Sequence, residues 1–257
     1  MPEGDTIHRT AATLRTVLEH QPLERFEAPR VGGRPPAAGS RIDAVEARGK
    51  HLLIRFDDGA VLHTHMRMTG SWHTYRPGEP WQRHASRARV VIQTPSSVAV
   101  CFDAPVIELL DERGLARHPQ LRALGPDLCA AEPDVDEALR RLDALDPATP
   151  IGVALLDQRV ASGVGNVYRC EVLWACGADP FRPVARVEAD LRRRLLGTAA
   201  RMLRANLEGR RRRTVPEGLA VYDRAGRPCR RCGTTILTRR LGEQARSVWW
   251  CPACQTA

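Results

Sequence analysis

Hydrophobic residues recur at helical spacing close to the start of the chain. They are separated by four, three and four positions and comprise Ile7, Ala11, Leu14 and Leu18. Such spacing places all these side chains on one face of a helix. The pattern therefore predicts an amphipathic helix over residues 5–20, with Pro2 and Glu3 just before its N-terminus.

The pattern changes between residues 41 and 102, where short apolar runs alternate with turn residues. The runs lie at 52–54, 61–62, 89–92 and 98–102. Asp57-Asp58-Gly59 stands between the first two runs and Pro95-Ser96-Ser97 between the last two. Paired runs around such turns are typical of β-hairpins. Several hairpins in succession predict an antiparallel sandwich or barrel.

Helical spacing dominates from about Leu128 onward. The segments with this pattern are 134–145, 151–157, 166–175 and 187–207. Thr149 is the expected N-cap of the second segment and Pro150 its first helical residue, since these residue types favour those positions. The last segment carries an apolar stripe made of Val187, Leu191, Leu195, Ala199 and Leu203.

These patterns together predict a multidomain protein of the α+β class. An antiparallel β-sandwich with a leading helix is expected over residues 1–127, and a helical domain over 128–220. A cysteine-rich hairpin is expected over 221–257, and it is too small to fold without a stabilising element.

Composition and charge favour a nucleic acid partner. The 257 residues are 43% hydrophobic, which indicates a folded chain, and their net charge is +9. Between Arg186 and Thr214, ten arginines stand against three acidic residues. Such a surplus suits a polyanion, with nucleic acid ahead of an acidic membrane surface. A basic surface that is merely solvated is the alternative interpretation.

The sequence indicates a cytoplasmic protein without a membrane segment. Its first residues are neither basic nor apolar, unlike a secretory signal. No apolar run reaches the roughly 18 residues that a membrane span requires. The scattered cysteines are expected to be buried small residues and not disulfides, as in a reducing compartment. They are Cys101, Cys129, Cys170 and Cys176.

Two further cysteine pairs have metal-binding spacing. Eighteen residues separate the pairs, which are Cys229 with Cys232 and Cys251 with Cys254. Four thiolates form a closed tetrahedral zinc site that leaves no position open for chemistry. We therefore expect one structural Zn²⁺ that holds a hairpin built from 236–237 and 248–250. Two redox pairs are the alternative.

A glycine-rich segment has the chemistry to contact phosphate. Gly163-Val164-Gly165-Asn166 lies between two short helices, where glycines allow close backbone approach and a helix N-terminus attracts an anion. An ordinary corner between helices is the alternative.

Removal of Met1 would leave Pro2 with a secondary amine. An α-amino pKa near ~8 leaves roughly a tenth of such groups neutral at pH 7. The amine can attack a sugar C1′ and form an iminium ion, with Glu3 as general acid or base.

Together the motifs resemble the formamidopyrimidine-DNA glycosylase and endonuclease VIII family of bifunctional DNA glycosylases. Pro2-Glu3 begins the chain as in that family, and Arg48-Gly49-Lys50-His51-Leu52-Leu53 resembles its strand with an essential lysine. Leu155-Leu156-Asp157-Gln158 through Gly163-Val164-Gly165-Asn166-Val167-Tyr168 matches its helix-two-turn-helix. Val221-Tyr222-Asp223-Arg224-Ala225-Gly226 leads into its zinc finger, so the resemblance covers nearly the whole chain.

The resemblance implies catalytic roles at the start of the chain. Pro2 would be the nucleophile, and Glu3 would protonate or position the sugar during ring opening. Lys50, which is the only lysine in the sequence, would bind the phosphates that flank the lesion.

The resemblance also implies a set of DNA contacts. Asn166, with the N–H groups around Gly165, would hold phosphate, as would Arg246 on the zinc hairpin. The target base must leave the stack. Met68 is the candidate wedge for the resulting gap, because apolar side chains suit unstacking.

Departures from the family pattern favour the endonuclease VIII branch, which prefers oxidised pyrimidines. Residues 102–107 stand where the 8-oxoguanine branch carries an intercalating loop, and the stretch before Val221 is short for its capping loop. Many members have a glutamate at the position of Thr6. Here Asp5 precedes it, so that second carboxylate is displaced or absent.

Other residues have two interpretations each. His63 and His65 alternate on a predicted strand, and packing is favoured over metal binding. The run at 210–213 is either a phosphate-facing loop or solvated. Glu171 either lines the pocket or lies on a helix surface.

The sequence thus predicts a monomeric DNA glycosylase and abasic-site lyase of base excision repair. It would remove oxidised bases, in particular pyrimidines, through a Schiff base on Pro2 and cut the strand by β,δ-elimination. Its partner would be double-stranded DNA with oxidised bases or abasic sites, with binding that weakens as salt rises. A catalytically inactive damage sensor of the same fold is the first alternative, and an RNA-binding zinc protein the second.

Overall fold

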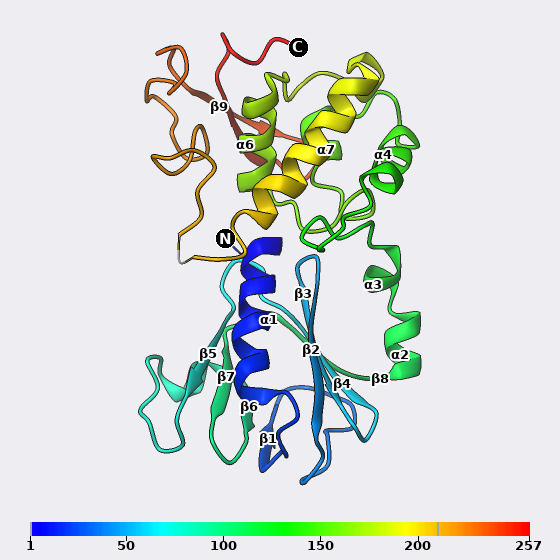
Figure 1. Cartoon of the computed structure of the whole chain (residues 1–257), viewed down its shortest axis with the longest axis vertical. Helices are drawn as coiled ribbons and strands as arrows, with labels where there is room; N and C mark the ends of the chain where they lie inside the picture. The colour runs from blue at the N-terminus through cyan, green and yellow to red at the C-terminus, as the bar shows by residue number, and fades with distance from the viewer. Residues whose placement is uncertain (1, 210) are drawn as a thin grey trace. The chain divides into compact units, whose positions relative to one another are not determined.

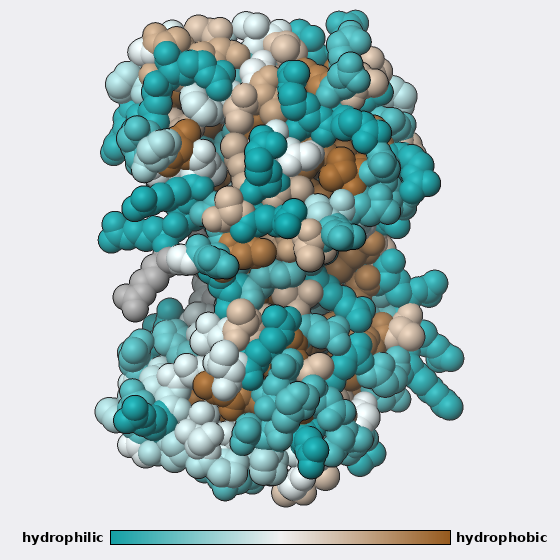
Figure 2. Space-filling model, in the orientation of Figure 1, coloured by the Kyte–Doolittle hydropathy of each residue, from teal (hydrophilic) through white to brown (hydrophobic). Residues whose placement is uncertain are grey.

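The computed structural model of the chain describes residues 2–209 and 211–257. It contains two compact units, Met1–Arg122 and Ala123–Ala257, which we call the N-terminal and C-terminal units. On the face shown in Figure 2, hydrophilic residues cover most of the surface and hydrophobic ones are scattered. No helix in the described ranges is long and apolar enough to cross a membrane.

The N-terminal unit consists of one long helix and two antiparallel four-stranded sheets. Helix α1 spans Gly4–Leu18. One sheet has the order β1-β6-β7-β5 and the other β2-β3-β4-β8. The strands are β1 (Arg25–Glu27), β2 (Ile42–Arg48), β3 (His51–Phe56), β4 (Ala60–His65), β5 (Ser71–Tyr75), β6 (Ala88–Gln93), β7 (Val98–Phe102) and β8 (Val106–Asp111). A 3₁₀ turn, η1 (Ala85–Arg87), precedes β6, and the short helices α2 (Glu112–Arg117) and α3 (Pro119–Ala123) follow β8.

The predicted apolar stripe of α1 is confirmed as part of the core of this unit. All its residues are buried, in one cluster with side chains of both sheets such as Leu52, Leu62 and Ile92. Helix α1 contacts β2 and β3 of one sheet and β5 of the other, as Figure 1 shows. The helix ends at Leu18 and not at His20, because Glu19 has an extended backbone (ψ 136°).

Both predicted hairpins are present. Strands β3 and β4 pair in the register Leu53↔His63 around Gly59, whose φ is 84°. Strands β6 and β7 pair around residues 95–97. The predicted antiparallel β-sandwich with a leading helix is therefore confirmed.

The C-terminal unit combines helices with a two-stranded hairpin. Its elements are α4 (Val135–Asp143), α5 (Ile151–Ala154), α6 (Asn166–Cys176), η2 (Val184–Arg186), α7 (Ala189–Arg204), β9 (Leu237–Leu241) and β10 (Arg246–Trp250). The predicted stripe of α7 is buried against the other helices. The hairpin shares a second core with α6, in which Trp174 packs beside Cys229 and Val248.

Helix α5 differs from its prediction at both ends. Pro150 is the N-cap, in an extended conformation bridged to Pro183, and not the first helical residue. The helix stops at Ala154, three residues earlier than expected. Tertiary contacts explain the start, because Ile151 N–H donates to Arg182 O (2.8 Å) and Gly152 N–H to Pro180 O (3.0 Å). Residues beyond the helix continue as tight turns, with Leu156 N–H on Val153 O (2.9 Å).

Candidate functional site

Pro2 and Glu3 lie directly before the first residue of α1. Glu3 is the N-cap residue, and its carbonyl accepts from the N–H groups of Thr6 (2.9 Å) and Ile7 (3.1 Å). Its side chain is fully buried, while Pro2 is half-buried. A carboxylate and the nitrogen of Pro2 are thus held in consecutive residues at the positive end of a helix dipole.

Asp5 and Thr6 lie in the first turn of the same helix. The Asp5 side chain is fully buried and forms an ion pair with Arg9 (3.5 Å). Thr6 donates its hydroxyl to Asp5 Oδ1 (3.3 Å). The acidic group adjacent to Thr6 is therefore engaged with Arg9 and Thr6 inside the N-terminal unit.

Lys50 lies at the tip of the β2–β3 hairpin. Arg48 pairs with His51, so only Gly49 and Lys50 form the turn. Gly49 has a φ of 57°, and glycine at the first central position is what a type II′ turn requires. In Figure 1 this turn lies at the same end of the N-terminal unit as the start of α1.

Met68 projects from the loop between β4 and β5. Its side chain is 68% exposed, whereas Met66 is buried. The loop is pinned at its far end, where Thr69 Oγ1 donates to Asp103 O (3.0 Å). A Cβ on Gly70 would lie 2.8 Å from backbone atoms of Met66, so only glycine fits there. An exposed apolar side chain on a tightly held loop has the form expected of a wedge.

Only residues 103–105 connect β7 to β8, the segment where an intercalating loop would lie. Asp103 has a φ of 53°, and its carboxylate is bound by Arg83 (2.9 Å) and Arg87 (2.7 Å). These ion pairs lower the pKa of Asp103, with the hydrogen bond from Arg87 as the largest cause. The connection is thus a short, clamped turn.

The segment between α5 and α6 is organised by a glutamine whose role the sequence did not suggest. Gln158 donates from Nε2 to Leu156 O (2.8 Å) and Val164 O (2.9 Å), and its Oε1 accepts from Gly163 N–H (3.2 Å). Gly163 has a φ of 103°, which favours glycine. Gly165 is the N-cap of α6, so the predicted glycine turn leads directly into a helix N-terminus.

Asn166 joins the start of α6 to the start of β10. Its Nδ2 donates to Ser247 O (2.9 Å), and its Oδ1 accepts from Arg169. Arg169 is completely buried and also donates to Ser247 O (2.7 Å). The structure therefore brings Asn166 close to Ser247, the neighbour of the exposed Arg246. The side chain of Asn166 is used inside the protein, so a phosphate here would meet backbone N–H groups.

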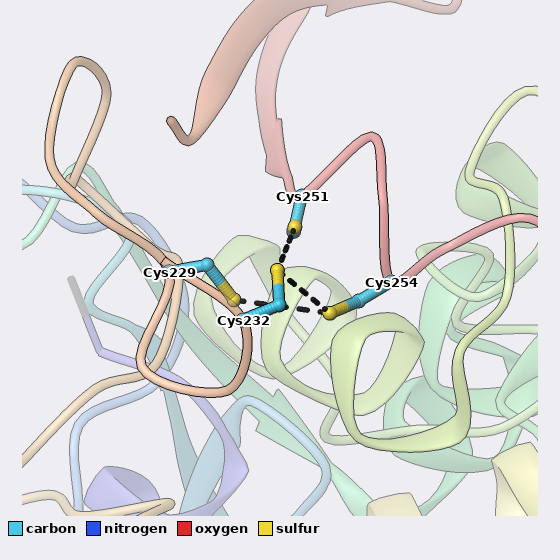
Figure 3. A group of neighbouring side chains, drawn as sticks. All are labelled: Cys229, Cys232, Cys251 and Cys254. Carbon is cyan, nitrogen blue, oxygen red and sulfur yellow. Dashed lines mark hydrogen bonds between the residues drawn. The ribbon is translucent and has the colours of Figure 1, made fainter. Parts of the chain in front are cut away.

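The four paired cysteines converge as the spacing predicted. The Sγ–Sγ distances are 4.0 Å for Cys229 with Cys254, 3.5 Å for Cys232 with Cys251 and 3.3 Å for Cys232 with Cys254 (Figure 3). Zinc–sulfur bonds of about 2.3 Å in a tetrahedron place sulfurs about 3.8 Å apart. The donor set and spacing therefore fit a structural zinc ion.

Hydrogen bonds favour the thiolate form of Cys229 and Cys232, whereas burial raises the pKa of Cys251 and Cys254. Trp174 Nε1 donates to Cys229 Sγ (3.3 Å), and so does the Arg231 N–H (3.4 Å). Hydrogen bonds from the side chain and backbone of Thr234 lower the pKa of Cys232 to about 6. Strands β9 and β10 form the expected hairpin beside this cluster.

The scattered cysteines agree with their prediction in all but one respect. All eight cysteines lie in the described ranges, and none forms a disulfide. Burial raises the pKa of Cys101 to about 12 and of Cys170 to about 11, so these thiols are inert. Cys129 is also buried, but Cys176 is only half-buried.

Glu171 does not lie on a helix surface. Its side chain is fully buried, and its oxygens accept from the N–H groups of Ala220 (2.7 Å), Val221 (2.9 Å) and Tyr222 (2.8 Å). The hydroxyl of Thr214 also donates to it. The carboxylate thus anchors the segment that leads into the cysteine hairpin. The run at 210–213 includes one position outside the described residues.

A β-sandwich with a leading helix, a glycine turn between two short helices and a four-cysteine hairpin define a class of DNA repair proteins with a helix-two-turn-helix. Two family models match the chain, the formamidopyrimidine-DNA glycosylase N-terminal domain over residues 1–117 and the H2TH domain of the same family over 124–215. The chain belongs to the formamidopyrimidine-DNA glycosylase and endonuclease VIII family.

Its relatives include endonuclease VIII proteins. It is 41% identical to "DNA-(apurinic or apyrimidinic site) lyase Nei2" of Mycolicibacterium smegmatis, over 100% of both chains. It is 39% identical to "Probable endonuclease 8 2" of Streptomyces coelicolor, over 99% of this chain and 94% of that one. A structure of Lactococcus lactis Fpg in complex with DNA that contains N7-benzyl-Fapy-dG has the same fold, with a TM-score of 0.85, 21% identity and full coverage of both chains.

Proposed function

We propose that the protein removes oxidised bases from double-stranded DNA and then cleaves the strand at the abasic site. The membership of its family and the names of its relatives support a glycosylase and lyase of base excision repair. The observation that carries the chemistry is the position of Pro2, directly before the buried Glu3 at the amino end of α1.

Pro2 is the nucleophile in this proposal, once Met1 is removed. The positive end of the α1 dipole disfavours a second positive charge, so it favours the neutral, nucleophilic amine. Attack on C1′ displaces the base, and the amine loses its proton. The C1′–O4′ bond then breaks, O4′ takes up a proton as the sugar ring opens, and C1′ and the Pro2 nitrogen are left as an iminium ion. The iminium then accepts the electron pair of the C2′–H bond, and the 3′ phosphate leaves by β-elimination. A second elimination releases the 5′ phosphate.

Glu3 is the proton donor and acceptor for these steps. Its carboxyl group is shielded from water, which strengthens its interaction with the sugar as the ring opens. Lys50 binds the phosphates flanking the lesion, since its ammonium is a compact charge at the tip of a rigid turn.

Phosphate contacts from the C-terminal unit come from the start of α6 and from β10. We propose that the backbone N–H groups at Gly165 and Asn166 bind phosphate, and that Arg246 grips it from the hairpin. Zinc, held by the four cysteines, keeps that hairpin folded and takes no part in the chemistry. Met68 fills the space left by the extruded nucleotide.

Oxidised pyrimidines are the proposed substrates. The endonuclease VIII relatives support this choice, and so does the short 103–105 turn, which has no room for an intercalating loop. That the protein is monomeric and cytoplasmic stays a prediction from the sequence.

Borohydride trapping tests the proposal. The protein is incubated with a duplex that carries an abasic site or an oxidised pyrimidine, reduced, and searched for a covalent adduct by mass spectrometry. We expect the adduct on Pro2. Since the sequence contains a single lysine, Lys50→Ala removes the only competing side-chain amine and should still allow trapping.

Two control proteins, one that retains Met1 and one with Pro2→Gly, test whether the adduct forms on the Pro2 nitrogen. Protein that retains Met1 should give no adduct on Pro2, and Pro2→Gly should trap more weakly. If correctly processed protein binds the DNA and gives no adduct, the lyase assignment is wrong. The inactive damage sensor would then be the better account. Equal binding to RNA and to damaged DNA would favour the second alternative, an RNA-binding zinc protein.

A further inference from the structure

Four histidines and a glutamate gather on one face of the sheet β2-β3-β4-β8. His51 begins β3, His63 and His65 lie in β4, Glu108 lies in β8, and His118 is the C-cap of α2. His63 pairs with both Leu53 and Glu108, which places these side chains on one face. The core residues of the same strands lie on the opposite face, because side chains alternate along a strand.

Hydrogen bonds connect these residues in a chain. His118 Nε2 and His63 Nδ1 approach the same oxygen of Glu108, at 2.9 Å and 2.7 Å. His63 Nε2 lies 2.8 Å from His51 Nδ1. His63 is fully buried and His51 is 5% exposed, so the chain runs from a half-buried carboxylate into the interior.

The hydrogen-bond partners of His118 and His63 indicate which ring nitrogen carries the proton. His118 Nδ1 accepts from the Leu121 N–H (3.2 Å), so its proton is on Nε2 and points to Glu108. Burial opposes ionisation of Glu108, but hydrogen bonds from both histidines outweigh it and lower its pKa. Glu108 is therefore an ionised acceptor. His63 donates to it from Nδ1 and accepts from His51 Nδ1–H at Nε2.

The same assignment argues against a metal ion between His63, Glu108 and His118. A metal bound at His118 Nε2 would require the proton on Nδ1, and that nitrogen accepts the Leu121 N–H. His63 is fully buried, as the packing interpretation predicts. Its partners, Glu108 and His118, come from distant parts of the sequence that the strand pattern could not identify.

His65 extends this network to the loop that carries Met68. Its Nδ1 accepts from the Arg67 N–H (3.1 Å), and its ring packs edge-on against His51, with centroids 4.7 Å apart. Arg67 has a φ of 44°, a left-handed conformation that costs a non-glycine residue free energy. The bond to His65 therefore holds a strained residue in place directly before Met68.

We propose that His65, supported by the chain of His51, His63 and Glu108, is a positioning residue that fixes Met68 for insertion before DNA binds. This inference rests on the proposed function, in which Met68 is the wedge. His51 directly follows Lys50, so the same network supports both the wedge loop and the phosphate-binding turn. A loop that is already ordered loses less conformational entropy when it inserts.

The paired substitutions His65→Asn and His65→Gln test this role. The asparagine side-chain oxygen can occupy the position of Nδ1, whereas glutamine reproduces the position of Nε2. We expect His65→Gln to slow single-turnover cleavage of an oxidised pyrimidine about tenfold, with reduced fluorescence of a 2-aminopurine opposite the lesion. His65→Asn should recover most of both signals, and equal urea midpoints exclude a stability difference. Equal rates for both variants and the wild type would overturn the inference.

A double-mutant cycle separates positioning from general structural damage. In Met68→Ala protein, His65→Gln should change the cleavage rate less than twofold, because the side chain through which it acts is gone. An undiminished tenfold loss in that background would contradict the proposal. Borohydride trapping of the wild type on the same duplex reports on the proposed function itself, so failure of the two ideas can be told apart.

Discussion

Lys50 places the one ammonium side chain of the protein at the tip of a two-residue turn. Gly49 and the Arg48↔His51 pair fix the turn, and His51 is in turn fixed by His63. Lys50 could be identified from the sequence, because it is the only lysine and lies in the motif Arg48-Gly49-Lys50-His51-Leu52-Leu53. The sequence could not identify the network behind it, because Glu108 and His118 are brought there by the sheet pairing and by α2.

Lys50→Ala should reduce the salt dependence of DNA binding. Each phosphate contact that is lost should make the slope of log K against log salt concentration shallower by about 0.9. The measurement is a titration of undamaged duplex at several salt concentrations by fluorescence anisotropy. Lys50→Arg, which keeps the charge, is the control. An unchanged slope in Lys50→Ala would remove this residue from the phosphate site.

Arg169 is a buried charge that donates to backbone and amide oxygens, among them Ser247 O and Asn166 Oδ1. Replacement by leucine removes a donor to Asn166 Oδ1 and one of the two donors to Ser247 O, so we expect a loss of about 3 kcal/mol in the free energy of unfolding. Urea denaturation measures it, with Arg240→Leu on the exposed face of β9 as the control. Equal urea midpoints for the two variants would show that the hydrogen bonds of Arg169 contribute little to the free energy of unfolding.

At the scale of secondary structure, patterns that depend on local periodicity were predictable. The stripes of α1 and α7 and the two hairpins follow from spacing and turn residues alone. Helix α5 was not predictable in its bounds, because Pro180 and Arg182 supply the acceptors at its start. The residues around Thr149 and Pro150 satisfy the usual helix-start preferences, yet a tertiary bridge to Pro183 overrides them.

The β3–β4 turn should make stability depend on pH. Burial acts to raise the pKa of Asp58, but the N–H groups of Ala37 (2.8 Å) and Ala60 (3.1 Å) and the charge of Arg34 outweigh it and lower the pKa. A lowered folded-state pKa means that this stabilisation is present above the unfolded pKa of about 3.9. It is lost as the pH falls further through the folded-state value.

Asp58→Asn should therefore destabilise the protein by about 1 kcal/mol at pH 7, and by less near pH 3. Thermal unfolding across this pH range measures the effect. Exposed Asp43 offers a control substitution, Asp43→Asn, which should follow the wild-type profile. A pH-independent difference between Asp58→Asn and the wild type would contradict the argument.

At the scale of the whole molecule, the chain forms two compact units with separate cores. The order of the motifs predicted the family, and the family models and relatives bear this out. The order of the motifs does not reveal which polar side chains form hydrogen bonds inside the protein and so stabilise the fold. Asn166 and Glu171 show this, since both carry side-chain bonds that stabilise the C-terminal unit.

Removal of zinc should unfold part of the C-terminal unit and spare the N-terminal unit. Cys229 and Cys251 belong to the core that the hairpin shares with α6, and a structural zinc supplies on the order of 10 kcal/mol. Hydrogen exchange after chelation should show lost protection in β9, β10 and the adjoining part of α6. Cys251→Ser should reproduce the effect, while Cys176→Ser should not. Equal loss in both units would mean that they do not fold independently.

The exposure of Met68 makes this side chain sensitive to oxidants, and the protein is proposed to act where DNA has been oxidised. The oxidants that modify bases also convert an accessible thioether into a sulfoxide, which is polar and ill-suited to sit among stacked bases. Met66 is buried, so Met68 is the more vulnerable of the two methionines in its loop. Peroxide should therefore inactivate the protein, methionine sulfoxide reductase should restore it, and Met68→Leu should resist. The fraction of the protein that stays active during oxidative stress would then depend on how fast cellular reductants restore the Met68 thioether.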